Sequence, residues 1–386
     1  MVGIPFCEPF QAPGERRNLD MALAEGLRSV SGRFSLQSRG RLKQIVGGGE
    51  VFLTTSGSAA LELALLVAGI GAGDEVILPS FTFTSVANAV VLRGAIPVFI
   101  DVDPVSLNVT AELIAPAITP RTRAVIVVHY AGVVADMVPI VELAHRHGIV
   151  VIEDAAHAIG STHDGRPAGS FGDFAAFSFH YTKNVSCGEG GCLVVNDRAR
   201  VPAAEIAFEK GTNRSAFING LVDKYSWVAV GSSYTLSELN AAVLDAQLAA
   251  LDTITAERRR QWRRYSSALA DWAPPLGIAL PRPAASGEHN AHLFHLILAS
   301  DDDRADFIAF MRTRSITAPF HYVPLHSAPA GLRFGRTVGD MAASEIAGNR
   351  LVRLPLYPGL GDSIEDVIAA VLAWGEQRNG FNRRVG

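Results

Sequence analysis

Short apolar runs alternate with amphipathic segments between about residues 50 and 200 of the chain. The apolar runs are four to six residues long and rich in β-branched side chains, which is typical of strands that are buried on both faces. We therefore predict strands at residues 51–54, 75–78, 97–101, 124–129, 149–153, 175–179 and 193–196.

Helix-like stretches lie between several of these predicted strands, at residues 59–67, 85–92 and 139–147. The alternation of strands and helices indicates an α/β fold, in which helices flank a mainly parallel central sheet. In such sheets, ligands bind at the carboxyl ends of the strands, so functional groups are expected there.

The pattern changes in the last third of the chain. A long helix-like stretch at 239–264 precedes a proline-rich link, a predicted strand at 292–298 and predicted helices at 304–312 and 365–374. The 386 residues are also too many for one small core. We predict a large domain at residues 1–250 and a smaller C-terminal α+β domain at residues 251–386.

Composition excludes several classes of protein. The net charge of −4 argues against binding of nucleic acid or of an anionic membrane. The arginine-rich residues 258–264 have acidic and apolar neighbours, so they are predicted to be the exposed face of a helix. No apolar run approaches the ~20 residues that span a bilayer.

Cysteine usage and the N-terminal sequence indicate the cytoplasm. The chain has three cysteines, Cys7, Cys187 and Cys192, which form neither an even disulfide framework nor a set of zinc ligands. We therefore expect free thiols and no metal site. The N-terminal residues lack the charged region and apolar core of a signal peptide.

Lys183 is a candidate for covalent chemistry. Only four of the 34 lysine and arginine residues are lysines, so arginine supplies most of the positive charge. A primary amine can lose its proton and form a Schiff base, whereas a guanidinium stays protonated. Lys183 follows a predicted strand and precedes the glycine-rich residues 188–191. A surface lysine at the end of a strand is the alternative interpretation.

Two further motifs lie at predicted strand ends. Residues 54–61 read Thr-Thr-Ser-Gly-Ser-Ala-Ala-Leu and open a predicted helix, where backbone N–H groups can bind a phosphate. Asp154 follows the predicted strand 149–153, and a buried carboxylate there needs a cationic partner. Simple helix capping is the alternative for either motif.

Together, the small-residue helix start, Asp154 and Lys183 form the set that pyridoxal phosphate requires. The cofactor's phosphate binds helix N–H groups, its pyridinium nitrogen binds an aspartate and its aldehyde binds a lysine amine. Aromatic side chains in residues 79–83 can cover the ring. The sequence therefore predicts a site for pyridoxal phosphate.

The chain resembles the nucleotide-sugar aminotransferases of the DegT–StrS type, which are fold-type I pyridoxal phosphate enzymes. The resemblance covers nearly the whole chain and is carried by residues 73–77, 79–83, 94–99, 153–157, 178–180, 183 and 188–191. Within the family, the chain is most similar to the 4-aminotransferases that act on TDP-4-keto-6-deoxy-D-glucose. That similarity lies in residues 182–184, 210–215, 222–227 and 231–234.

The resemblance implies roles for the site residues. Lys183 would form the Schiff base and move a proton between C4′ of the cofactor and the substrate carbon, while Asp154 would keep the pyridinium nitrogen protonated. His157 would contact the phenolic oxygen, and Phe83 would stack on the ring. The residues expected to bind the phosphate are Gly57, Ser58 and Ser178.

One stretch departs from the pattern of the family. Many relatives have Gly-Tyr-Asn-Tyr-Arg where residues 231–235 of this chain read Gly-Ser-Ser-Tyr-Thr. The asparagine of those relatives reaches the phosphate in the neighbouring subunit, and Ser233 would have to do so with a shorter side chain. The resemblance therefore implies a homodimer with shared active sites.

Five further residues are candidates for substrate contact: Lys210, Arg214, Lys224, His321 and His326. The three basic residues could bind the diphosphate of a nucleotide sugar, and the two histidines lie in a stretch that resembles one near the sugar site of the family. Surface charge and packing are the respective alternatives.

The implied reaction has two halves. L-glutamate would convert the cofactor to pyridoxamine phosphate, and the amine would then pass to C4 of the TDP-4-keto-6-deoxyhexose. The product would be a TDP-4-amino-4,6-dideoxyhexose. A 3-keto sugar or a cyclitol is the alternative acceptor, and a regulator that binds the cofactor without turnover is the alternative outside enzymes.

Overall fold

The computed structural model describes residues 3–27, 31–283 and 286–385, so the outer limits of the predicted domains, residues 1 and 386, lie outside the described residues. A central sheet contains eight of the strands: β1 (Glu50–Thr54), β2 (Glu75–Pro79), β3 (Ile96–Ile100), β4 (Thr122–Val128), β5 (Val150–Asp154), β8 (Phe174–Ser178), β9 (Gly191–Val195) and β11 (Arg336–Thr337). Their order across the sheet is β1-β9-β8-β5-β4-β2-β3-β11.

The sheet is mainly parallel, as predicted. Only β9 runs antiparallel to its neighbours β1 and β8, whereas the other adjacent pairs are parallel. The first and last residues of the seven predicted strands lie within two residues of the observed bounds. Strand β11 was not predicted, because two residues at a sheet edge carry no periodicity.

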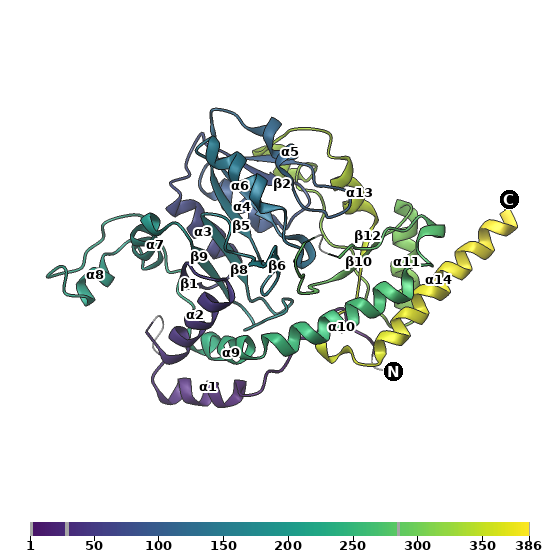
Figure 1. The fold of residues 1–386 in the computed structure, drawn as a ribbon, viewed down its shortest axis with the longest axis horizontal. Helices are drawn as coiled ribbons and strands as arrows, with labels where there is room; N and C mark the ends of the chain where they lie inside the picture. Colours follow the sequence, from purple (N-terminus) through teal and green to yellow (C-terminus); the bar gives the residue numbers. More distant parts are fainter. Residues whose placement is uncertain (1–2, 28–30, 284–285, 386) are drawn as a thin grey trace.

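Helices cover both faces of the sheet (Figure 1). Alternate residues of β4 belong to opposite cores: Val125 and Val127 face one side, Ala124 and Ile126 the other. The first side is covered by α1 (Glu15–Ala24), α2 (Arg33–Ile45), α5 (Ala111–Ile114), α6 (Met137–Arg146) and α9 (Glu238–Ala249). The second side is covered by α3 (Gly57–Val67), α4 (Thr84–Leu92) and α7 (Val201–Phe208). Burial on both faces explains why the strands are continuously apolar.

The C-terminal part of the chain has a hydrophobic core of its own. This core joins α10 (Leu251–Leu269), β10 (Phe294–Ile297), α11 (Asp301–Thr313), β12 (Leu351–Leu354) and α14 (Ser363–Val385). Strands β10 and β12 form a separate antiparallel pair, and α14 lies beside α10 (Figure 1). The domain boundary after residue 250 stays a prediction.

Several short elements complete the fold. The remaining helices and strands are β6 (Thr162–His163), β7 (Arg166–Pro167), α8 (Arg214–Ile218), α12 (Pro329–Phe334) and α13 (Ala342–Arg350). Single 3₁₀ turns occur at Ala115–Ala117, Tyr130–Gly132, Arg198–Arg200, Pro274–Leu276 and Pro358–Leu360. The three cysteines are free thiols, as predicted. Within the described ranges, no helix combines the length and apolar character needed to cross a membrane.

One prediction for the arginine-rich stretch is wrong. The stretch lies on α10, and Arg260, Arg263 and Arg264 are exposed as expected. Arg258, however, is only 5% exposed, and its guanidinium donates to the carbonyl oxygens of Ala291 and His292. One side of α10 packs on the C-terminal core, so the helical period turns Arg258 inward.

Candidate active site

A cavity of about 800 Å³ lies at the carboxyl ends of β5 and β8. Its wall also includes the starts of α3 and α4, the loop after β8, and β12. The predicted site residues that line it are Gly57, Ser58, Phe83, Asp154, His157, Ser178, Lys183 and His321. The volume is that of a small-molecule site, for which roughly 300–1,000 Å³ is usual. Residues from separate motifs therefore meet around one cavity.

Asp154 ends β5 and places a carboxylate on the cavity wall. The side chain is 7% exposed, and its Oδ1 accepts the backbone N–H of Ala156 at 3.0 Å. Burial raises the pKa of Asp154, whereas the Ala156 N–H and the charge of Lys183 lower it. This carboxylate is thus an acceptor for an N–H group of a ligand, with a cation in its surroundings.

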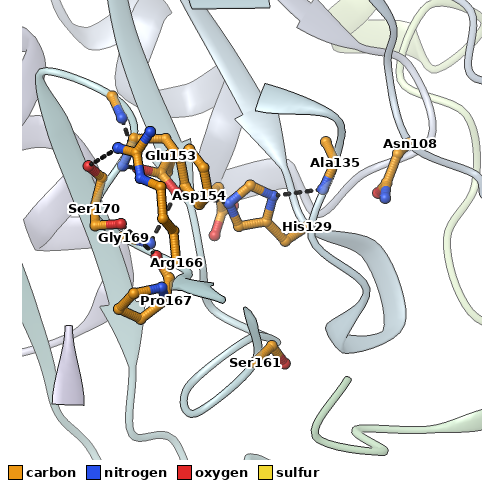
Figure 2. A network of polar contacts seen from close by, with 12 residues as sticks. Asn108, His129, Ala135, Glu153, Asp154, Ser161, Arg166, Pro167, Gly169 and Ser170 are labelled. Carbon is orange, nitrogen blue, oxygen red and sulfur yellow. Dashed lines mark hydrogen bonds and ion pairs between the residues drawn. The ribbon is translucent and has the colours of Figure 1, made fainter. Parts of the chain in front are cut away.

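A buried polar network fixes the end of β5 behind Asp154 (Figure 2). The neighbouring Glu153 is fully buried, and its carboxylate lies 2.9 Å from Nε2 of His129. Nδ1 of His129 accepts the N–H of Ala135 at 3.3 Å, so the ring proton is on Nε2 and points at Glu153. Three backbone N–H groups also donate to Glu153 at 2.7–2.8 Å, those of Gly169, Phe171 and Gly172. Successive strand residues face opposite sides, so this network holds Asp154 toward the cavity.

Lys183 lies in the loop between β8 and β9. Its backbone N–H donates to the His180 carbonyl at 2.8 Å, and the side-chain amide of Asn184 donates to the Asn290 carbonyl at 3.0 Å. Burial lowers the pKa of the Lys183 amine to about 8; the charge of Asp154 raises it and that of Arg353 lowers it further. About a tenth of such an amine is neutral at pH 7, which makes it far more nucleophilic than an exposed lysine.

The start of α3 and the end of β8 meet at one end of the cavity. A Cβ on Gly57 would lie 2.8 Å from Cβ of Ser178, so glycine permits this close approach. Oγ of Ser56 accepts a backbone N–H of the first helical turn at 3.0 Å, and Oγ of Ser58 lies 2.5 Å from Oγ of Ser85. The other N–H groups of the first turn have no partner within the helix. Hydroxyls and free N–H groups at a helix start form an anion site.

Stacked rings form another part of the wall. The ring of His157 stacks on that of His292 with centroids 4.1 Å apart, and the Tyr322 hydroxyl lies 3.2 Å from Nε2 of His157. His321 stacks on Tyr322 at 3.6 Å. Burial lowers the pKa of His157 well below its usual value, so the ring is neutral. Within the described part of the chain, Nδ1 of His157 is buried without a hydrogen-bond partner, which suits a polar ligand atom.

Comparison with known proteins identifies the family of the chain. The DegT/DnrJ/EryC1/StrS aminotransferase family matches the chain over residues 13–372. The chain belongs to this family. Its fold is accordingly that of a fold-type I aminotransferase, as predicted.

Solved structures of aminotransferases are similar to this one over nearly its whole length. DesV from S. venezuelae, in complex with a ketimine intermediate, is 32% identical with a TM-score of 0.87 over 97% of this chain and 99% of that chain. TlmJ from Streptoalloteichus hindustanus is 30% identical with a TM-score of 0.87, over 98% and 99%. The proposed sugar aminotransferase Spr1654 from Streptococcus pneumoniae, in its PMP form, is 25% identical with a TM-score of 0.90, over 99% and 100%.

The aminotransferase uses pyridoxal phosphate, and the cavity fits that cofactor. Spr1654 has been solved in PLP and PMP forms. The wall offers an amine for the aldehyde (Lys183), a carboxylate for the ring nitrogen (Asp154) and an unpartnered ring nitrogen (His157). The glycine-serine start of α3 supplies the small, N–H-rich surface that a phosphate needs.

Four predicted residues of the aminotransferase lie on a projecting arm, here defined as residues 209–233, and do not line the cavity of their own chain. They are Lys210, Arg214, Lys224 and Ser233, and all four are exposed. Figure 1 shows the arm, with α8, extending away from the sheet. Arg214 lies 3.6 Å from Glu209 of the same arm.

His326 also lies outside the cavity lining. Its Nδ1 is 2.6 Å from Oγ of Ser80, and its Nε2 is 3.1 Å from the carboxylate of Glu345. These contacts join the residue after β2 to α13. His326 therefore lies where the alternative interpretation, a role in packing, would place it.

Several cavity residues of the aminotransferase were not predicted: Thr82, Ser85, Arg258, His292, Tyr322 and Arg353. Thr82 and Ser85 follow β2 and lie in or beside the aromatic segment 79–83, so a local motif could have identified them. Arg353 is the one charged residue in the otherwise apolar run 351–356, and a charge in such a run indicates a functional role. The others reach the cavity only through tertiary packing.

Proposed function

We propose that the enzyme transfers the amino group of L-glutamate to C4 of TDP-4-keto-6-deoxy-D-glucose and forms a TDP-4-amino-4,6-dideoxyhexose. The observation that carries this proposal is the presence of Lys183 and Asp154 on one cavity wall in a member of an aminotransferase family. The similarity to Spr1654, a proposed sugar aminotransferase, supports a sugar as the acceptor. The identity of the keto sugar rests on the sequence motifs at residues 182–184 and 210–215.

Seven of the cavity residues have a proposed task. Pyridoxal phosphate, when bound, supplies an electron sink that stabilises negative charge at the substrate carbon. Lys183 holds the cofactor and then moves the proton at the substrate carbon, and Asp154 keeps the ring nitrogen protonated. His157 receives the phenolic oxygen, and Phe83 covers the ring. The phosphate is assigned to Gly57, Ser58 and Ser178.

The electrostatics of the wall support these tasks. The Lys183 amine, with a pKa near 8, can exist in both protonation states close to neutral pH, as proton transfer requires. Burial raises the pKa of Asp154, but a protonated ring nitrogen beside it would favour the carboxylate form. The neutral His157 ring can present a hydrogen-bond donor or acceptor to an oxygen.

We also propose that the enzyme is a homodimer with shared active sites. The arm exposes large apolar side chains, among them Leu221 (75%) and Trp227 (78%), which a second copy would cover. Its basic residues and Ser233 lie outside the lining of the cavity of their own chain, and in a dimer they would serve the cavity of the partner. Analytical ultracentrifugation should show a dimer for the wild type and a monomer for Leu221→Ser/Trp227→Ser. Leu332→Ser, which changes an exposed leucine of α12 outside the arm, should remain dimeric.

We expect the protein to work in the cytoplasm. Its three cysteines are unpaired thiols, and two of them, Cys187 and Cys192, are buried. Free thiols of this kind are typical of a reducing compartment.

The proposed reaction is tested with the purified, cofactor-loaded enzyme, L-glutamate and TDP-4-keto-6-deoxy-D-glucose. We expect 2-oxoglutarate and one 4-amino product, whose C4 configuration is read by NMR, and neither product with Lys183→Ala. Transfer only to a 3-keto sugar or a cyclitol, assayed in parallel, would contradict the proposed acceptor. A cofactor spectrum that glutamate leaves unchanged would favour a regulator.

A further inference from the structure

Arg353 lies on the wall of the cavity and has no assigned task in the reaction described above. It is the third residue of β12, where it pairs in register with His295 of β10. Its guanidinium lies over the ring of Phe6 at 4.3 Å, and both residues line the cavity. Burial lowers the pKa of Arg353 from its usual value.

The guanidinium of Arg353 is held in place but has spare donors. Its Nε and Nη2 both donate to the carbonyl oxygen of Phe320, at 3.2 and 2.7 Å. An arginine carries five N–H donors, so three remain for another partner. Among the residues that the structure describes, no carboxylate lies within 4.0 Å of this guanidinium. The Phe6 ring and the Phe320 carbonyl therefore orient the guanidinium. Its remaining N–H groups have no carboxylate partner among the described residues.

Arg258 is a second arginine of this kind on the same wall. It is 5% exposed and lines the cavity, and among the described residues it donates to the carbonyl oxygens of Ala291 and His292 and to no carboxylate. Burial lowers its pKa to about 9. The partly buried Arg336, by contrast, has a carboxylate partner: it binds the buried Glu75 at 2.7 Å. An oriented, desolvated guanidinium without an anion is costly, and a ligand anion offsets that cost.

The position of Arg353 relative to Lys183 indicates which anion it receives. Arg353 and Lys183 line the same cavity. Arg258, which lines it too, donates to the carbonyl oxygen of His292, and Nδ1 of His292 lies 2.9 Å from Oδ1 of Asn184, the residue after Lys183. An anion bound at Arg353 therefore lies close to the carbon that reacts at Lys183. In an α-amino acid the carboxylate is one bond from that carbon. In a nucleotide sugar the diphosphate is attached at C1, across the ring from C4.

We propose that Arg353, with Arg258 of the same cavity, forms the carboxylate subsite and binds the α-carboxylate of the amino donor. This inference rests on the proposed transamination, and it adds the group that recognises the donor. The planar fork of Arg353 suits two parallel hydrogen bonds to a carboxylate. The phosphate end of the cavity is built from other elements, α3 and β8, so the two anions do not compete.

The two half-reactions separate donor from acceptor. With the cofactor-loaded enzyme, the change in cofactor absorbance on mixing with L-glutamate reports the first half-reaction alone. We expect Arg353→Gln to raise the glutamate concentration for half-maximal rate by roughly 100-fold, the effect of losing a charge-assisted pair. The pyridoxamine phosphate form of the same variant should aminate the keto sugar with wild-type KM. Arg353→Lys should recover part of the loss, because it keeps the charge but not the fork.

A binding measurement provides a readout that does not depend on turnover. Calorimetric titration of the loaded enzyme with glutarate, which has carboxylates but no amine, should give a binding isotherm that Arg353→Gln abolishes. Arg333→Gln is the matched control, because Arg333 also stacks on a phenylalanine ring, Phe334, at 4.8 Å, but is exposed outside the cavity. Unfolding by urea should confirm that each variant is folded.

The outcomes distinguish this subsite from the proposed function. A wild-type enzyme that does not bind glutarate, or a loss in Arg353→Gln confined to the keto-sugar half-reaction, overturns the subsite. If the keto sugar is not aminated while the glutamate half-reaction depends on Arg353, the acceptor is wrong and the subsite stands. If glutamate does not react but glutarate binding still requires Arg353, the donor is wrong and the subsite again stands.

Discussion

The two walls of the cavity have different origins. The sheet wall comes from one stretch of the chain, residues 154–183, and its groups follow directly from the ends of β5 and β8. The second wall is assembled from residues between 258 and 353, which are carried by α10, the segment before β10, and β12. The first wall carries Asp154 and Lys183, and the second carries Arg258 and Arg353.

The difference suggests a division of labour. The sheet wall is fixed by parallel strand pairing and by the buried Glu153 network, as precise positioning of reacting groups requires. The second wall rests on a separate core and presents guanidinium groups suited to binding. Changes in the sheet wall should therefore remove both half-reactions, whereas changes in the second wall should alter the use of one substrate.

The largest effect is expected for Lys183→Ala. Removing the amine removes the covalent attachment and the proton carrier, so both half-reactions should slow by about 10⁴-fold or more. Stopped-flow absorbance of each half-reaction measures this. Lys43→Ala, which removes an exposed partner of Glu50, should leave the rates unchanged. Substantial glutamate-dependent turnover in Lys183→Ala would contradict the assignment.

Asp154→Asn should have the next largest effect. The amide retains an acceptor for the Ala156 N–H but loses the charge that favours a protonated ring nitrogen, so kcat should fall by about 10²–10³-fold. Both half-reactions should slow together, which steady-state and single-turnover rates can establish. The exposed Asp252→Asn on α10 is the control. Slowing of only one half-reaction would contradict the proposal that the sheet wall serves both half-reactions.

Glu153→Gln tests the support behind the sheet wall. The carboxylate accepts three backbone N–H groups and faces the His129 Nε2–H, whereas an amide would turn an N–H₂ group toward some of these donors. We expect the free energy of unfolding to fall by about 3 kcal/mol, measured by urea denaturation. Glu142→Gln, on the exposed side of α6, should change it little. Equal stability of the two variants would show that the network is not a support.

The smallest expected effect is a shift in pH dependence. The rate at which the apoenzyme attaches added pyridoxal phosphate should rise with pH around a midpoint near 8, because the neutral Lys183 amine reacts. Arg353→Gln should move this midpoint upward, since loss of a nearby cation favours the protonated amine. Arg333→Gln should not move it. A wild-type midpoint near the ordinary lysine value of about 10.4 would contradict a buried amine.

The sheet wall could be predicted from the sequence because its signals are local. Continuous apolar runs indicated the strands, and Asp154, Lys183 and the Ser-Gly-Ser helix start each follow a strand directly. In a parallel sheet these ends lie on one edge, so motifs far apart in sequence could be joined into one site.

The second wall could not be predicted in this way. Arg258 was interpreted as exposed, because the helical period alone does not show which face packs on the C-terminal core. Arg353 reaches the cavity through the pairing of β12 with β10, which no local pattern reports. The arm residues Lys210, Arg214 and Lys224 were grouped with the site from their motif, yet the arm carries them away from the cavity of their own chain.

The central claim is that Lys183 holds the cofactor on the sheet wall. Borohydride reduction of the cofactor-loaded enzyme fixes the cofactor on the lysine that holds it, and peptide mass spectrometry then locates the added mass. Among the four lysines of the chain, Lys43, Lys183, Lys210 and Lys224, only the peptide with Lys183 should carry it. Labelling of another lysine, or of none, would contradict the account.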